Sequence, residues 1–257
     1  MIILFPTFSH MKNVIRSINP HISVDCVIFG FSTSQLKVLL IQRDYTDENG
    51  ALAQDLKLPG DFITTREDID LAAARTLNEL TGLQNIFLEP FAVFGKPDRI
   101  YKKEDLDWFR ETTGTDIQRV LTTAYFALIN IGESNSDYAL NNNASWIDVH
   151  QVPKLAFDHQ EIINKGLSHL QNALRNEPIG FELLPEKFTI RKLQTLYEVI
   201  LNCELDNRNF RKKILKAKHL IQLDEKQAGV AHKPAYYYRF DKTIYDQNKK
   251  NFLGFNF

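Results

Sequence analysis

The sequence is short of cysteine and of long hydrophobic runs. Only two of its 257 residues are cysteines, Cys26 and Cys203. Because they lie far apart, we expect two buried thiols rather than a disulfide, which fits a reducing cytoplasm. No apolar run approaches the roughly 20 residues of a membrane span, and the first residues lack the charged flank and cleavage site of a signal peptide. We therefore expect a soluble, cytoplasmic protein without a membrane partner.

The net charge of the whole chain, −1, conceals two segments of opposite sign. Residues 186–257 contain 15 Lys and Arg against 8 Asp and Glu, a net charge of +7, so residues 1–185 carry −8. Such an asymmetry indicates two modules, one of which meets a polyanion. The length also allows either one large domain or two smaller ones.

Residues 58–83 combine a glycine-containing loop with apolar residues at helical spacing. The segment resembles the Nudix box, whose pattern is Gly, five residues, Glu, seven residues, then Arg-Glu-apolar-x-Glu-Glu-x-Gly-apolar. Aligned on Arg75 and Gly82, the pattern's first glutamate falls on Glu67 and a later one on Glu79. We expect Glu67 to pair with Arg75, and Gly82 to end the helix in the left-handed conformation.

Two carboxylates of that pattern are missing. They fall on Thr76 and Leu80, which are one helical turn apart on the same face, while the opening glycine falls on Asp61, next to Gly60. Mg²⁺ prefers hard oxygen ligands, so Thr76 is a weak ligand and Leu80 none. We therefore expect no catalytic residues, no metal and no cofactor. The degenerate box comprises Gly60, Glu67, Arg75, Thr76, Glu79, Leu80 and Gly82.

Two alternatives to this interpretation of the segment stay open. An ordinary amphipathic helix followed by glycine would give much of the same pattern. An active hydrolase of ADP-ribose or a related diphosphate would need a metal site rebuilt from Glu67, Glu79 and residues outside the box.

The segments flanking the box predict a mixed sheet sandwiched by helices. Residues 24–29 and 37–43 are typical of a β-hairpin, and further strands are expected at 86–94, 120–129 and 146–148. Helices are expected at 69–80 and 158–172, and the polar insert 98–116 is expected to be a surface loop. The fold class that we predict is α/β, a Nudix-like α/β/α sandwich over residues 15–175.

The pattern changes after residues 176–185, which we interpret as a linker. Thr189 is a good N-cap for a first helix, and a second, basic helix is expected at 207–217. Two strands, 219–223 and 236–240, then complete the order of a winged helix-turn-helix domain over residues 186–245, leaving a tail at 246–257. His219 and His232 do not have the spacing of zinc ligands.

The C-terminal module resembles that of the Nudix-related transcriptional regulators. The resemblance spans about residues 20–243; its most specific part is the run 206–213, Asp-Asn-Arg-Asn-Phe-Arg-Lys-Lys, and 157–162 also resembles a motif of that family. It implies a homodimer that binds a double-stranded DNA operator. Base contacts are expected from Arg208, Asn209, Arg211 and Lys212, and phosphate contacts from Lys213, Lys216, Lys233 and Arg239. A protein that binds an acidic protein partner through this module is the competing class.

The resemblance also implies a small effector in the Nudix-like domain. Members of the family respond either to ADP-ribose or to sugars such as arabinose. Because Thr76 and Leu80 remove the cation that would hold a diphosphate, the sequence favours a sugar of carbohydrate catabolism, with ADP-ribose as the alternative. The candidate effector contacts are Arg43, Asp61, Phe62, Asp98 and His159, although each is also explained as a surface or structural polar residue.

Overall fold

The computed structural model describes residues 17–32, 34–117, 119–132, 143–176, 180–231 and 233–244. It has a mixed α/β domain followed by a winged helix domain, which confirms the predicted fold class. Residues 15–16, residues 177–179 of the expected linker, His232 and the tail 246–257 lie outside the described residues.

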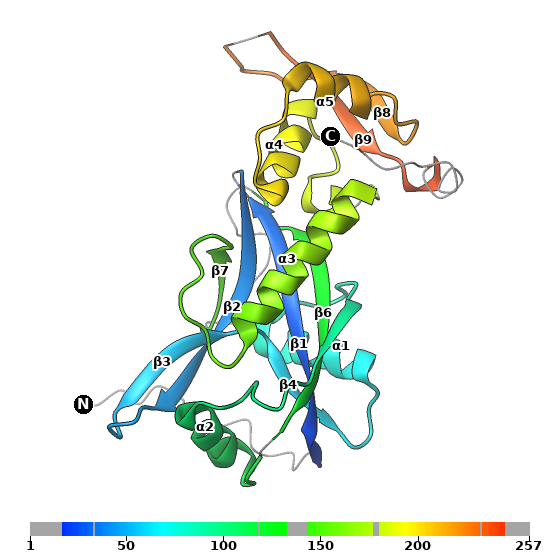
Figure 1. Ribbon diagram of the computed structural model, residues 1–257. Coiled ribbons are helices and arrows are strands. Elements are labelled where there is room, and N and C mark those ends of the chain that lie inside the picture. The colour runs from blue at the N-terminus through cyan, green and yellow to red at the C-terminus, as the bar shows by residue number, and fades with distance from the viewer. Residues whose placement is uncertain are drawn as a thin grey trace, which may run out of the picture.

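A mixed sheet forms the centre of the first domain (Figure 1). Its strands are β1 (Ile18–Ser32), β2 (Gln35–Thr46), β3 (Leu52–Lys57), β4 (Gly60–Thr64), β5 (Glu89–Phe94), β6 (Leu121–Asn130) and β7 (Ala144–Asp148). The main path runs β3-β2-β1-β6-β5, while β4 pairs with β1 and β7 with β2. The predicted hairpin is present as β1 and β2, and β1 also pairs in parallel with β6.

Two helices cover the two faces of this sheet. Because side chains alternate along a strand, Cys26 and Ile28 face one side and Val27 and Phe29 the other. The helix of the box, α1 (Ile69–Thr81), packs on the first side. The long helix α3 (His159–Asn176) lies across the second side, at the front in Figure 1. The expected helix at 69–80 is therefore confirmed.

The expected surface loop at 98–116 is wrong in part, because residues 103–113 form a helix, α2 (Lys103–Thr113). Gly114, at φ 71°, ends it in the left-handed conformation. The helix is highly charged, but Phe109 and Asp105 are buried beneath it. Asp105 is held there by Arg43, which lies 62 residues earlier in the chain. Strands β3 and β4 were not predicted.

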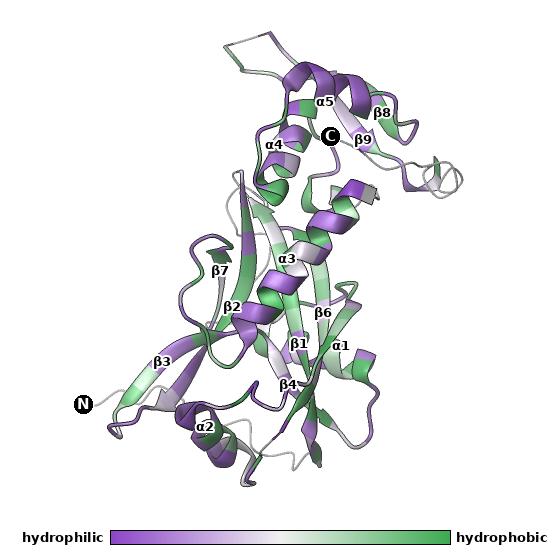
Figure 2. Ribbon diagram, in the orientation of Figure 1, coloured by the Kyte–Doolittle hydropathy of each residue, from purple (hydrophilic) through white to green (hydrophobic). Residues whose placement is uncertain are grey.

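The winged helix domain has the predicted order of elements. The helix α4 (Ile190–Leu201) begins at Thr189, whose side chain accepts a hydrogen bond from the Lys192 backbone N–H. The helix α5 (Asn207–Ile214) ends three residues earlier than predicted, and the strands β8 (Leu220–Lys226) and β9 (Tyr236–Phe240) pair as the wing. Figure 2 shows that α5 is hydrophilic over most of its length.

The two domains share one apolar core. Phe181, Leu183 and Leu184, in and beside a 3-10 helix (Phe181–Leu183), are buried in the same cluster as Phe29 of the sheet and Leu196 of α4. Residues 180–184, within the segment that we interpreted as a linker, thus join the two hydrophobic interiors.

The two cysteines differ in their surroundings. Cys26 is buried in the sheet, as expected, but Cys203 is exposed, because it follows the end of α4 at Asn202. The expectation of a second buried thiol was wrong. Across the parts of the chain that the structure describes, no helix is both long and apolar enough to span a bilayer.

Candidate effector and DNA sites

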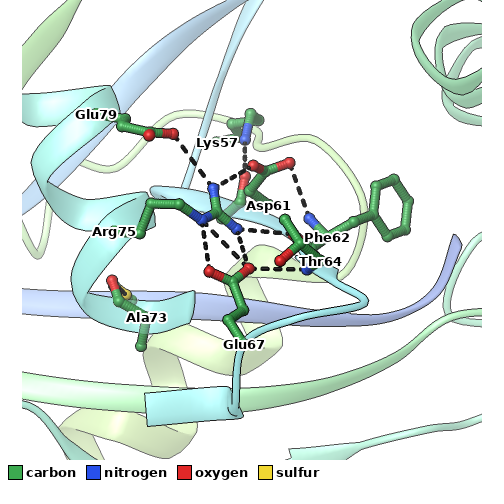
Figure 3. A network of polar contacts seen from close by, with 10 residues as sticks. Lys57, Asp61, Phe62, Thr64, Glu67, Ala73, Arg75 and Glu79 are labelled. Atoms are coloured by element: carbon green, nitrogen blue, oxygen red, sulfur yellow. Dashed lines mark hydrogen bonds and ion pairs between the residues drawn. The ribbon is translucent and has the colours of Figure 1, made fainter. Parts of the chain in front are cut away.

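The guanidinium of Arg75 forms hydrogen bonds with the remaining carboxylates of the box and with Asp61 (Figure 3). It donates to both oxygens of Glu67, with N–O distances of 2.8–3.2 Å, to Asp61 at 2.9 Å and to Glu79 at 3.3 Å. Burial opposes the charge of Arg75, but the hydrogen bonds to Glu67 and Asp61 outweigh it and raise the pKa of the guanidinium. The expected pair of Glu67 and Arg75 is therefore present and braces the loop against α1.

The box does not fit a divalent cation. Thr76 is completely buried, and its hydroxyl oxygen has no hydrogen-bond partner among the described residues. Leu80 offers no ligand, and the carboxylates of Glu67 and Glu79 are both engaged by Arg75. The part of the chain that the structure describes contains no group of three or more His, Cys, Asp or Glu residues placed to hold a metal ion. The arrangement is that of a braced loop rather than a metal centre.

The loop that opens the box adjoins a small cavity of about 50 Å³, enough for a few water molecules. A Cβ atom on Gly60 would lie 1.9 Å from a carboxylate oxygen of Asp25, so only glycine fits at this position. Three of the five expected effector residues, Asp61, Phe62 and His159, line the cavity. Aromatic residues close it: Phe62, Trp108, Phe109 and Phe157.

Buried charged groups form the polar side of the cavity. Arg99 donates two hydrogen bonds to Asp158, at 2.9 and 2.7 Å, and lies 3.7 Å from Asp25. Asp158 directly precedes α3, and its carboxylate binds Arg99. Asp98, an expected effector contact, is exposed and does not line the cavity, whereas its neighbour Arg99, which was not predicted, does.

His159, the first residue of α3, fills a structural position in this cluster. Its Nδ1 accepts a hydrogen bond from the Leu58 backbone N–H at 2.8 Å, so Nε2 carries the ring proton and lies 3.4 Å from Asp25. Burial, reinforced by the charge of Lys57, holds the pKa of His159 well below its usual value. The neutral ring thus joins the start of α3 to the loop of the box.

Arg43 lies outside the lining of the cavity. It is buried, donates to Asp55 at 2.6 and 2.8 Å and to Asp105 at 2.8 Å, and its guanidinium carbon lies 4.6 Å from the centre of the Phe157 ring. These contacts fasten α2 and the segment before α3 to the sheet. A ligand contact would have to displace one of the two carboxylates.

The expected DNA-reading residues lie together on α5 and the wing. Asp206 caps α5, accepting from the Asn209 backbone N–H at 2.7 Å, while Phe210 and Ile214 are buried against the domain. The opposite face therefore points to solvent. Exposed residues are Arg208, Asn209, Arg211, Lys212 and Lys216 on or next to α5, with Lys233 and Arg239 at the wing; Lys213 is half-buried.

Comparison with known proteins matches both parts of the chain. Residues 19–166 match the NUDIX domain family, and residues 180–240 match the NrtR DNA-binding winged helix domain. An ADPR responsive transcriptional repressor NtrR of Acinetobacter baylyi is 30% identical over 92% of this chain and 88% of its own. An ADP-ribose pyrophosphatase of Methanocaldococcus jannaschii is 29% identical over 57% of this chain and 72% of its own.

The solved structure of Shewanella oneidensis NrtR complexed with a 27mer DNA has the same fold. It matches with a TM-score of 0.65 and 23% identity over 91% of this chain and 97% of that chain. The agreement extends over both domains, as does the match to the Acinetobacter repressor. The chain therefore belongs to the family of Nudix-related transcriptional regulators, in which a Nudix domain is followed by a DNA-binding winged helix domain.

Proposed function

We propose that this protein is a transcriptional regulator whose effector is ADP-ribose or a closely related nucleoside diphosphate ribose. The observation that carries the proposal is the similarity, over nearly the whole chain, to a repressor described as ADPR responsive. The Nudix domain alone is also similar to an enzyme of ADP-ribose. These relatives support the alternative that the sequence left open, and not the sugar of carbohydrate catabolism that we favoured.

The chemistry of the cavity is compatible with such an effector. ADP-ribose combines a flat base with an anionic diphosphate, and the cavity adjoins both aromatic rings and buried cations. Arg99 at the cavity already has Asp158 as its counter-charge, but Lys57 has no direct carboxylate partner among the described residues, and a neutral sugar would not supply one. The aromatic wall of the cavity includes Trp108 and Phe109 of α2, so this helix is the element that we propose adjusts when the effector binds.

We further propose that the domain binds the effector without hydrolysing it. Hydrolysis by a Nudix enzyme depends on the cation that Thr76 and Leu80 do not hold. Turnover of ADP-ribose with Mg²⁺ or Mn²⁺ that disappears in Glu79→Gln would contradict this proposal. It would move the protein to the hydrolase class of its Methanocaldococcus relative.

DNA binding is assigned to the exposed face of α5 and to the wing. In winged helix domains a helix of this kind enters the major groove, and its first turn contacts base edges. A homodimer would place two such helices on a two-fold operator. A regulator of this kind would act in the cytoplasm.

The helix α3 offers a physical connection between the two sites. Its first residue, His159, touches the loop of the box, and Asp158 just before it binds Arg99 at the cavity. At its other end, Leu170 and Leu174 pack in the core shared with α4. Eighteen residues of helix span about 27 Å. A shift of α3 on effector binding would therefore change the placement of the winged helices.

The experiment measures thermal unfolding with ADP-ribose, arabinose or glucose, and DNA binding to sequences selected from a random library. ADP-ribose at 100 times its dissociation constant should add about 2.7 kcal/mol of stability and change DNA affinity. An effector changes DNA binding only if its affinity differs between the conformation that binds DNA tightly and the one that binds it weakly. ADP-ribose must therefore change both the thermal stability and the DNA affinity. Stabilisation by a sugar and not by ADP-ribose would overturn the assignment of the effector.

A further inference from the structure

Lys57, the last residue of β3, is a buried cation that no carboxylate partners directly. Its side chain lines the cavity and is 7% exposed. The ammonium donates to the backbone carbonyl oxygen of Gly60 at 2.9 Å and makes a longer contact, 3.4 Å, with that of Leu58. Among the described residues, the contacts of this ammonium are with these backbone oxygens and the Trp108 ring, and none is with an Asp or Glu oxygen. Figure 3 shows this side chain pointing toward the turn that carries Asp61.

The other buried cations near the cavity are fully engaged. Arg43 binds Asp55 and Asp105, and Arg99 binds Asp158. The nearest acidic neighbours of Lys57 are also committed, because Asp61 accepts from Arg75 at 2.9 Å and Asp25 contacts Arg99 and His159. Burial lowers the pKa of Lys57, although the charges of Asp25 and Asp61 oppose this effect.

A buried charge without an ion partner costs free energy, and ionisable groups perturbed in this way cluster at functional sites. An ammonium group has three N–H donors, and two backbone carbonyls leave at least one for the cavity, where the centre of the Trp108 ring lies 5.9 Å from the ammonium. The group sits beside Gly60 and Asp61, where the box begins, but the box itself supplies no cation site at Thr76 and Leu80.

We propose that Lys57 binds a phosphate oxygen of the effector and supplies the positive charge that a metal ion supplies in Nudix enzymes. The inference rests on the proposed function and deepens it, because it makes Lys57 the residue that selects a nucleoside diphosphate over a neutral sugar. It also makes effector binding independent of divalent cations. An ammonium acts here as a point charge on the phosphate.

A structural role for Lys57 makes the opposite prediction for stability. If the residue only braced the turn at 58–60, its removal would destabilise the fold. If it is kept for a ligand, Lys57→Met removes a costly buried charge while retaining most of the side-chain volume, so the melting temperature should hold or rise. Lys57→Gln keeps a donor for the Gly60 carbonyl and serves as the second variant.

The test measures binding of ADP-ribose and of inorganic diphosphate to the full chain by calorimetry, with EDTA present. The wild type, Lys57→Met and Lys57→Gln are compared with Lys96→Met, which removes an exposed charge at Glu161, outside the cavity lining. We expect the two Lys57 variants to lose about tenfold to hundredfold in affinity for ADP-ribose, the effect of one charged hydrogen bond. Lys96→Met should bind like the wild type.

The outcomes separate this inference from the proposed function. ADP-ribose binding that the Lys57 variants retain would overturn the role of Lys57 and leave the proposed function standing. Wild-type binding of inorganic diphosphate but not ADP-ribose, lost in both Lys57 variants, would support the phosphate site and overturn the proposed effector. A wild type that binds neither, or binds only with a divalent cation, would overturn the inference.

Discussion

Gln171 of α3 donates a hydrogen bond from Nε2 to the backbone carbonyl oxygen of Ile200 in α4, at 2.9 Å. The bond joins the Nudix domain to the winged helix domain beside their shared apolar core. It is a polar, directional contact that adds to the apolar packing between the two helices.

Gln171→Ala should weaken the communication between effector and DNA. One neutral hydrogen bond is worth about 0.5–1.5 kcal/mol, so the ratio of DNA affinities without and with ADP-ribose should change about twofold to tenfold. Fluorescence anisotropy measures both affinities. Gln160→Ala is the matched control, because Gln160 is exposed on the same helix and its side chain donates to Asn164, within that helix. An unchanged ratio in Gln171→Ala would exclude this route.

Substitutions on α5 should separate sequence preference from general affinity. Arg208→Ala and Arg211→Ala should relax operator preference by about 1–3 kcal/mol each, the value of a two-pronged base contact. Lys216→Ala should weaken binding to all DNA and reduce the salt slope by about 1. Titrations on selected and scrambled DNA at several salt concentrations measure both effects. Lys154→Ala, an exposed change in the Nudix domain, should alter neither. If all three variants bind like the wild type, DNA binding lies elsewhere.

The double substitution Thr76→Glu, Leu80→Glu should create a need for a divalent cation. Thr76 is completely buried, so a carboxylate there costs free energy, and both new charges face a segment already rich in acid. The melting temperature should fall without metal and recover with Mg²⁺, as calorimetric Mg²⁺ binding appears. Asn78→Glu adds a charge at an exposed position of the same helix and should show neither effect. Tight Mg²⁺ binding by the wild type, without gain in the double variant, contradicts the degenerate site.

His159 should make the fold sensitive to mild acid. Its pKa in the folded state is held well below 6.5, first by burial and then by the charge of Lys57. The unfolded chain therefore takes up the proton first, and stability falls as the pH drops below about 6.5, by up to about 1.4 kcal/mol per pH unit. Urea unfolding from about pH 8 to about pH 5 measures this slope. His159→Gln should flatten it. The buried His219, whose pKa is also lowered by burial, should contribute a slope of the same sign.

Local patterns were sufficient where neighbouring residues carry the information. The caps at Thr189 and Gly82, the apolar spacing of α1 and the basic run of α5 are all short-range signals, and the structure has those elements. Strands β3 and β4 were missed because they are short, and β3 has few buried residues.

The composition of the cavity depends on contacts that no local pattern reveals. The charged segment 103–113 suggested a loop but forms a packed helix, α2. Its buried residue Asp105 is stabilised by a hydrogen bond from Arg43, which lies in β2. Nothing in the sequence indicated that Lys57 is buried, because lysine side chains are ordinarily exposed. Its burial follows from the way β3, β4 and α3 converge, which is a property of the tertiary fold.

The continuous core through Phe181, Leu183 and Leu184 has a consequence for exchanging parts of this protein. Cutting the chain at 176–185 would not give two independently folded domains. Each domain would expose the apolar surface that the other domain covers in the intact chain. A graft of this winged helix onto a foreign sensor would succeed only with the last turns of α3 and residues 180–184 carried along. In this chain the segment that can be exchanged as a unit is therefore larger than the DNA-binding domain itself.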